Sequence, residues 1–187
     1  MNNQYHIIGL MSGTSLDGLD IVKCRFQKKK KWKYTIDQCA TIPYSKYWTR
    51  KLKYLHEKSK EEIRKTDIEY GELLAKTTLE FIKTHKLECD YISSHGHTIL
   101  HRPELGYTLQ IGDGETISNI TRITTINNFR QLDVSLGGQG APLVPIGDLL
   151  LFPRYTYCLN LGGFANISEK FENKSITAFD ICPVNFV

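Results

Sequence analysis

Apolar and polar residues alternate along the first forty positions in the manner of β-strands. A short apolar run, Tyr5–Ile8, is followed by the turn-forming residues Ser12–Ser15. Apolar side chains then recur at every second position from Val22 to Phe26 and again from Trp32 to Ile36. This period is typical of half-buried strands. The opening segment is therefore predicted to form three strands joined by two tight turns.

Helical spacing replaces this alternation in the next segment. Thr66 and Glu69 have the spacing of a capping box, which predicts a helix that begins there. Its apolar face is predicted to hold Ile68, Leu74, Ala75, Leu79, Phe81 and Ile82. A less regular helix is expected from Tyr47 to Lys58.

The middle of the chain reads as short elements separated by loops. The predicted order is a strand 90–94, a loop 94–97, a hairpin 99–112 that turns at 103–106, a helix 114–119, a strand 122–127, a glycine-rich loop 136–145 and a helical turn 146–152.

After Pro153 the opening pattern returns. Strands are predicted at 155–161, 165–171 and 175–181, with Gly162 and Gly163 at the first turn. The chain is therefore predicted to be an α/β protein with a duplicated plan: a domain over residues 1–152 and the start of a second over 153–187. Three strands without covering helices cannot close a core. We therefore expect a truncated second domain that frays or self-associates, which favours a homo-oligomer.

Composition narrows the choice of partners and compartment. The 187 residues are 41% hydrophobic, and 24 Lys and Arg against 20 Asp and Glu give a net charge of only +4, so a dedicated nucleic-acid binder is not expected. The run Lys28–Lys31 is typical of a solvated hairpin tip, with a nucleic-acid patch as the alternative. No stretch approaches the roughly 20 apolar residues of a membrane span, and no secretory signal opens the chain. Five scattered cysteines without a CxxC pair predict free, mostly buried thiols in a cytoplasmic protein.

The turn after the first strand carries the first candidate chemistry. Residues 12–18 read SGTSLDG, and such a loop can direct backbone N–H groups and hydroxyls at phosphate oxygens. Asp17 or Asp20 could then hold Mg²⁺. An ordinary hairpin turn is the alternative. A second small-residue turn, Asn160–Gly163, stands at the matching place of the second copy. Two such hairpins facing each other form the phosphate clamp of actin-like ATPases and sugar kinases.

Other polar residues allow two interpretations each. His95, His97 and His101 lie within seven residues, but no further ligand has metal spacing, so hydrogen bonding to a polyhydroxyl ligand is favoured over zinc. Asp133 precedes a glycine-rich loop and could be a general base or the first residue of an Asx-turn. Asp113 could cap the following helix or touch a ligand.

Several longer motifs make the chain resemble one family. They are GLMSGTSLDGLD at 9–20, SHGHT at 94–98 with HRP at 101–103, QIGDGET at 110–116, GGQGAPLVP at 137–145, NLGGFANIS at 160–168 and Phe179–Asp180. In this order they resemble the N-terminal half of the anhydro-N-acetylmuramic acid kinase family, whose members are about twice as long.

The resemblance implies an actin-like (ribonuclease-H-like) kinase with ATP and Mg²⁺ in a central cleft. It implies that 1,6-anhydro-N-acetylmuramic acid, ATP and water become N-acetylmuramic acid 6-phosphate and ADP in cell-wall recycling. The implied ATP-phosphate loop is Gly13, Thr14, Ser15, Leu16, Asp17, Gly18, Leu19 and Asp20. The implied catalytic base is Asp133, and the implied sugar contacts are Thr98, Gln110 and Asp113.

Two other functions are compatible with the sequence. One is a non-catalytic module that binds sugar or nucleotide, and the other is an actin-like kinase with a different substrate. Because the resemblance covers only half of a family member, we expect these 187 residues alone to be inactive.

Overall fold

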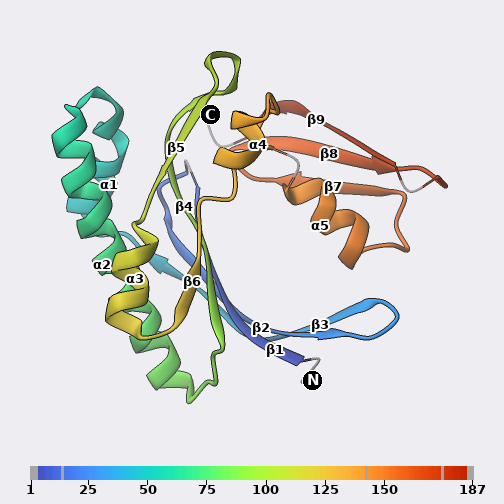
Figure 1. The fold of residues 1–187 in the computed structure, drawn as a ribbon, viewed down its shortest axis with the longest axis horizontal. Coiled ribbons are helices and arrows are strands. Elements are labelled where there is room, and N and C mark those ends of the chain that lie inside the picture. Colours follow the sequence, from blue (N-terminus) through green and yellow to red (C-terminus); the bar gives the residue numbers. More distant parts are fainter. Residues whose placement is uncertain (1–3, 14, 142, 174, 185–187) are drawn as a thin grey trace.

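The computed structural model describes residues 4–13, 15–141, 143–173 and 175–184 (Figure 1). The strands are β1 (Gln4–Ser12), β2 (Gly18–Lys28), β3 (Trp32–Pro43), β4 (Tyr91–Arg102), β5 (Tyr107–Ile111), β6 (Thr124–Ile126), β7 (Tyr157–Leu161), β8 (Phe164–Lys170) and β9 (Ile176–Pro183). The helices are α1 (Lys46–Lys53), α2 (Lys60–His85), α3 (Gly114–Thr121), α4 (Gln131–Ser135) and α5 (Leu143–Leu151), with 3₁₀ turns at Leu55–Glu57 and Pro103–Leu105. The protein is therefore a mixed α/β structure.

The larger sheet has the strand order β3-β2-β1-β4-β5, and β6 pairs with β4. The predicted three-stranded opening is confirmed, since β1, β2 and β3 pair antiparallel in sequence order. Strand β4 runs parallel to β1 and to β6. The parallel pairing places the carboxyl end of β1 beside the middle of β4, where Ser12 pairs with His97.

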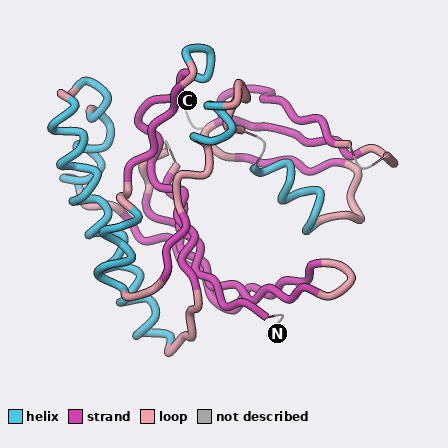
Figure 2. The backbone as a smooth tube through the Cα atoms, in the orientation of Figure 1, coloured by secondary structure: helices cyan, strands magenta, loops and turns pink. Residues whose placement is uncertain are grey.

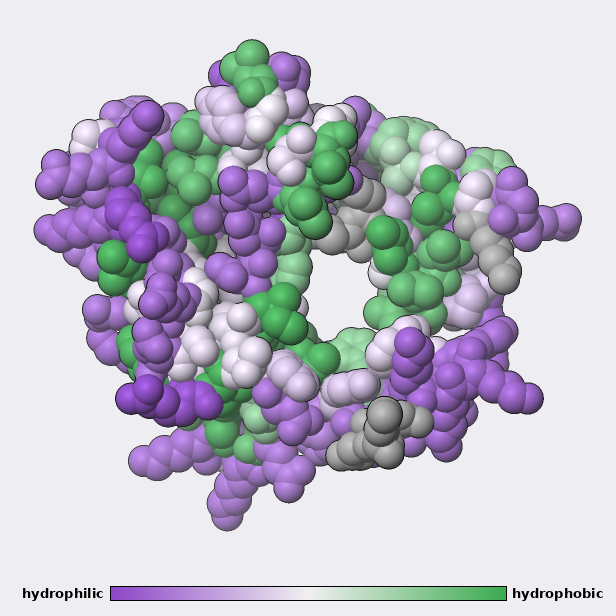
Figure 3. Space-filling model, viewed as in Figure 1, coloured by the Kyte–Doolittle hydropathy of each residue, from purple (hydrophilic) through white to green (hydrophobic). Residues whose placement is uncertain are grey.

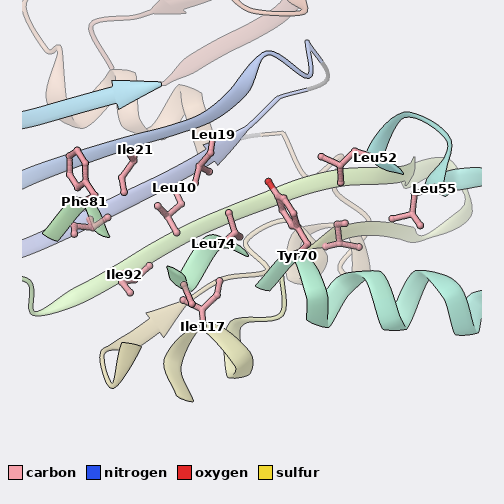
Figure 4. Packing of buried hydrophobic residues seen from close by; sticks show 13 residues of the cluster. Leu10, Leu19, Ile21, Leu52, Leu55, Tyr70, Leu74, Phe81, Ile92 and Ile117 are labelled. Carbon is pink, nitrogen blue, oxygen red and sulfur yellow. The ribbon is translucent and has the colours of Figure 1, made fainter. Parts of the chain in front are cut away.

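Helices α2 and α3 cover one face of this sheet (Figures 1 and 2). Figure 4 shows the core between them. Its buried side chains include Ile8, Leu10, Leu19, Ile21 and Ile92 from the strands and Tyr70, Leu74, Phe81 and Ile117 from the helices. Burial of this apolar surface is the main stabilising contribution to the sheet and its helices.

Helix α2 begins earlier than the sequence predicted. Its N-cap is Ser59, whose side chain accepts from the Glu62 N–H, so the capping box at Thr66 is wrong. The predicted apolar face is also wrong in part, because Ile68 and Leu79 are 38% and 37% exposed. Thr66 and Thr78 are buried instead. The face that meets the sheet therefore includes threonines, which a purely apolar count omits.

Strand β4 continues through the segment 94–97, which was predicted to be a loop. The β1–β4 register shifts between Leu10 and Ser12, opposite Ser94 and His97. Gly96 has a φ of +71°, and a Cβ there would lie 2.3 Å from the Ile111 carbonyl oxygen. A glycine therefore lets the strand bend at this point without ending.

The other predicted boundaries hold to different degrees. The hairpin of β4 and β5, helix α3 and strand β6 are confirmed. The helix predicted at 47–58 is shorter, since α1 ends at Lys53 and a 3₁₀ turn follows. The glycine-rich loop is likewise shorter than predicted, because α5 already begins at Leu143.

The second sheet has the order β7-β8-β9, antiparallel throughout, as predicted. Helix α5 is hydrogen-bonded to it: Ser168 Oγ donates to Asp148 Oδ2 at 2.6 Å, and Lys170 Nζ donates to the Asp148 carbonyl at 3.2 Å. The rings of Tyr34 and Phe152 meet edge to face, 5.9 Å apart, and join β3 to the end of α5. Figure 3 shows an opening through the molecule between the two sheets.

All five cysteines are free, as predicted, but the expectation of mostly buried thiols is wrong. Cys39 and Cys182 are exposed and the other three are half-buried. Within the described ranges, no helix combines the length and apolarity that crossing a membrane requires.

Candidate active site

The predicted phosphate loop follows the carboxyl end of β1. Gly13 and residues 15–20 are described, whereas Thr14 lies outside the described residues. The Leu16 N–H donates to the Gly13 carbonyl at 3.3 Å, and Leu16 has a left-handed φ of +56°. The Leu16 side chain packs against the core, which helps to hold this tight turn.

Two carboxylates accompany the loop. Asp17 Oδ1 accepts from Ser15 Oγ at 2.7 Å and from the Gly18 N–H at 3.0 Å. Asp20 Oδ1 accepts from Thr41 Oγ1 at 2.6 Å. Leu19, between them, is buried in the core, so only its backbone could meet a ligand.

The face of the larger sheet away from α2 and α3 carries a cavity of about 520 Å³. Asp20 pairs with Met11 and Thr41 on the neighbouring strands, so the three side chains share this face. Most of the lining comes from β1–β4: Gly9, Leu10, Met11, Asp20, Ile21, Val22, Cys39, Ala40, Thr41, Ser93 and His95, with Phe129 from the chain beyond β6. Asp20 is therefore the loop carboxylate that lines a cavity.

Thr98 and Gln110 lie opposite each other in the β4–β5 ladder. Gln110 Nε2 donates to Thr98 Oγ1 at 3.4 Å and to Thr108 Oγ1 at 2.8 Å. Gln110 Oε1 is buried and has no hydrogen-bond partner among the described residues. Because such an acceptor is costly to leave unsatisfied, it is a ready partner for a ligand O–H or N–H.

Asp113 is the N-cap of α3, one of its two predicted roles. Its Oδ2 accepts from the N–H and the Oγ1 of Thr116, and Arg64 donates to Oδ1 at 3.3 Å. Partial burial opposes ionisation, but the bonds from Thr116 and the charge of Arg64 hold the pKa of Asp113 below its ordinary value. The carboxylate is thus ionised and already engaged.

Asp133 lies in α4, and its Oδ2 accepts from the Gly140 N–H at 2.6 Å. The carboxylate thus closes the glycine-rich loop. The bond spans seven residues, so it is not the predicted Asx-turn, in which the side chain accepts from the N–H two residues on. Arg130 fixes the same loop to the sheet, because it donates to the Gly140 carbonyl at 2.8 Å and to His95 Nε2 at 2.9 Å. Arg130 was not among the predicted site residues, although it stands one helical turn before Asp133.

The three clustered histidines have different partners. His95 meets Arg130, His101 Nδ1 lies 3.0 Å from Thr108 Oγ1, and His97 Nδ1 lies 2.9 Å from Ser12 Oγ. Burial, with a smaller contribution from His95, lowers the pKa of His97 to about 4. No group of three or more potential ligands that could hold a metal ion occurs among the described residues.

The second sheet carries a polar row that extends from Asn160, the first residue of the second predicted phosphate turn, to two residues that were not predicted as site residues. Asn160, Asn166 and Asp180 lie directly opposite one another across β7, β8 and β9. No hydrogen bond or ion pair holds the Asp180 carboxylate within the described ranges. This row is the second sheet's counterpart of Met11, Asp20 and Thr41.

Comparison with known proteins identifies the family. A profile described as anhydro-N-acetylmuramic acid kinase matches residues 5–187. The chain belongs to the anhydro-N-acetylmuramic acid kinase family. Among curated relatives with that name, a Shewanella loihica protein is 38% identical over 197 residues, which are 98% of this chain and 52% of the relative. A Neisseria gonorrhoeae protein is 38% identical over 189 residues, with 96% of this chain and 51% of the relative covered.

A relative from Caldanaerobacter subterraneus subsp. tengcongensis is 38% identical over 202 residues, with 97% of this chain and 51% of the relative covered. The chain thus spans about half the length of the curated anhydro-N-acetylmuramic acid kinases that it matches.

Proposed function

We propose that this chain supplies the phosphate loop and the sugar contacts of an ATP-dependent kinase for 1,6-anhydro-N-acetylmuramic acid. The observation that carries the proposal is the family match over residues 5–187, in a chain where Ser12, the residue before the loop 13–20, pairs with β4, the strand of Thr98. The products are N-acetylmuramic acid 6-phosphate and ADP. In this proposal the 187 residues alone are inactive, because they span only about half the length of the relatives.

The proposed fold is the actin-like one, divided into domains 1–152 and 153–187. Three features support it: the order β3-β2-β1-β4 with β6 beyond β4, the antiparallel β2 among parallel β1, β4 and β6, and the second meander β7-β8-β9. In such a fold the two meanders face each other across the nucleotide.

The ATP phosphates are proposed to bind the loop Gly13–Asp20. Asp17 and Asp20 each have one carboxylate oxygen engaged by a neighbour, so the other remains for a ligand. Mg²⁺ typically binds through one or two carboxylates, substrate phosphates and water. These residues fit an ion that arrives with ATP, and that ion would neutralise charge on the phosphates.

Asp133 is the proposed general base, with Thr98, Gln110 and Asp113 as contacts for the sugar. Asp133 takes one proton from water while the water oxygen bonds to the anomeric carbon. The bond from that carbon to the bridging oxygen breaks, and the bridging oxygen, now O6, accepts the γ-phosphoryl group from ATP. Oδ2 of Asp133 is held by Gly140, so Oδ1 is the oxygen that would accept the proton.

The remaining proposals concern the cellular compartment, the partners and the oligomeric state. We propose a cytoplasmic enzyme that binds neither nucleic acid nor membrane and forms homo-oligomers through exposed apolar surface. The mild charge of +4 supports the first part, and the exposed Leu159, Leu161 and Phe179 support the second.

The test uses the gene product at its natural length, with ATP and 1,6-anhydro-N-acetylmuramic acid, and detects the 6-phosphate by mass spectrometry. Asp133→Asn is compared with Asp180→Asn, a matched loss of a carboxylate from the second sheet. The proposal expects product from the parent, a loss of about a thousandfold or more in Asp133→Asn, and a smaller loss in Asp180→Asn.

The other outcomes are equally informative. A loss confined to Asp180→Asn would move the base to the second sheet. Sugar binding without turnover by the folded parent would favour the non-catalytic module. Turnover of ATP with another sugar would favour a kinase of different specificity.

A further inference from the structure

Four polar side chains from distant parts of the sequence form one chain of hydrogen bonds beneath the phosphate loop. Tyr70 Oη lies 2.5 Å from Tyr44 Oη, Tyr44 Oη lies 2.7 Å from Ser12 Oγ, and Ser12 Oγ lies 2.9 Å from His97 Nδ1. Their positions are the middle of α2, the segment between β3 and α1, the end of β1 and the bend of β4. The proposed function does not use any of them.

The hydrogen bonds that link these four side chains all donate in the same direction, from Tyr70 toward His97. Tyr44 donates to Ser12, so its oxygen is left to accept from Tyr70. Ser12 then has its own proton to donate, and His97 Nδ1 is the acceptor. The low pKa of His97 supports a neutral ring, and a ring that accepts at Nδ1 has its proton on Nε2. Each hydroxyl thus has a defined partner and orientation.

These hydrogen bonds lie largely out of contact with water, which makes each of them costly to lose. Ser12 and His97 are each 3% exposed and Tyr70 is 0% exposed. A buried polar group that loses its partner costs more than the bond itself contributes, so the four side chains are tied to a single arrangement. Ser12 is the residue immediately before Gly13, so this arrangement fixes the point at which the phosphate loop leaves the sheet.

We propose that Tyr44, Tyr70 and His97 are positioning residues for the phosphate loop, acting through the Ser12 hydroxyl. The inference rests on the proposed function, since it assigns the loop to the phosphates of ATP. It predicts that loss of the Tyr44 hydroxyl weakens ATP use and leaves sugar use unchanged, because Thr98 and Gln110 are held by separate hydrogen bonds.

The decisive variant is Tyr44→Phe in the gene product at its natural length. Thr78→Val is the matched control, because the buried Thr78 hydroxyl donates only to the Leu74 carbonyl within α2. We expect the KM for ATP to rise about three- to tenfold in Tyr44→Phe, the factor expected of one buried hydrogen bond. The kcat and the KM for the sugar stay within about twofold of the parent. Thr78→Val is expected to lower Tm comparably without changing the KM for ATP.

Two further variants make the test independent of one substitution. Tyr70→Phe removes only the first donor, so a smaller rise in the KM for ATP is expected. His97→Gln keeps an acceptor for Ser12 and is expected to retain the parent KM, whereas the apolar His97→Leu raises it.

The possible results separate the two proposals. If the parent forms no product, the proposed function fails. If the parent is active and Tyr44→Phe and His97→Leu keep its KM for ATP, the positioning role is wrong. Equal changes in the KM values for ATP and sugar, matched by Thr78→Val, would also overturn it, since they indicate a general loss of stability.

Discussion

The two sheets differ sharply in how they bury apolar side chains. In the larger sheet Leu74 of α2 is 0% exposed, and it lies in a core closed by α2 and α3. In the second sheet Leu161 is 67% and Phe179 59% exposed. Because buried apolar area is the main source of stability, the larger sheet holds the protein together. The stability of the second sheet depends on α5 and on whatever covers the rest of its apolar surface.

The largest expected effect is on the free energy of unfolding, when an apolar side chain is shortened in each of the two sheets. Leu74→Ala should lower the free energy of unfolding by about 3 kcal/mol, because it leaves a cavity in a closed core. Leu161→Ala should change it by about 0.5 kcal/mol or less. Urea denaturation followed by tryptophan fluorescence, with amide exchange for the second sheet, measures both. Similar losses in the two variants would mean that Leu161 is covered in solution, and a dependence on protein concentration would identify a second copy as the cover.

The second largest expected effect is a loss of stability at acid pH that comes from the larger sheet. The folded pKa of His97, about 4, lies below its ordinary value of 6.5, so the unfolded state binds more protons between these values. Stability therefore falls as pH decreases from about 6.5 to 4, by about 2 kcal/mol from this residue.

All six histidines lie before residue 102, so no histidine of the second sheet contributes to this loss of stability. Denaturation at pH 7 and pH 4.5 should show a smaller difference for His97→Gln than for the parent. The exposed His56 provides the control, His56→Gln. An unchanged pH dependence in His97→Gln would contradict the burial of a neutral imidazole.

The smallest effect concerns the attachment of α5. Ser168→Ala removes the 2.6 Å bond to Asp148 and should cost about 1 kcal/mol. Amide exchange should become faster in β7, β8 and β9 and stay the same in β1 and β4. Ser175→Ala, an exposed serine of the same sheet region, should leave exchange unchanged. Equal exchange in Ser168→Ala and the parent would show that α5 is not what holds the second sheet.

The strands were the most predictable part of the fold. Period-two alternation predicted β2 and β3, and the return of the strand–turn–strand–strand plan after Pro153 predicted β7, β8 and β9. The errors occurred where local signals compete. Ser59 and Thr66 both start a Ser/Thr-x-x-Glu pattern, and only tertiary burial decides that Thr66 belongs to the interior of α2.

The candidate site was predictable only in part for a similar reason. The loop 13–20 and Gln110 belong to recognisable local motifs. Tyr44 and Tyr70 do not, because their roles come from contacts 32 residues apart, between Ser12 and Tyr44, and 26 residues apart, between Tyr44 and Tyr70. No pattern within one segment records such a contact.

The edge-to-face contact of Tyr34 with Phe152 has a mechanical consequence. The second sheet is joined to the larger one by the covalent connection through α4 and, separately, by the packing of α5 and Phe152 against β3, in which this pair of rings takes part. A body held at two points keeps one rotation, about the line between them. The opening in Figure 3 can then widen or narrow along a single coordinate, and one distance between labels on the two sheets would follow that motion.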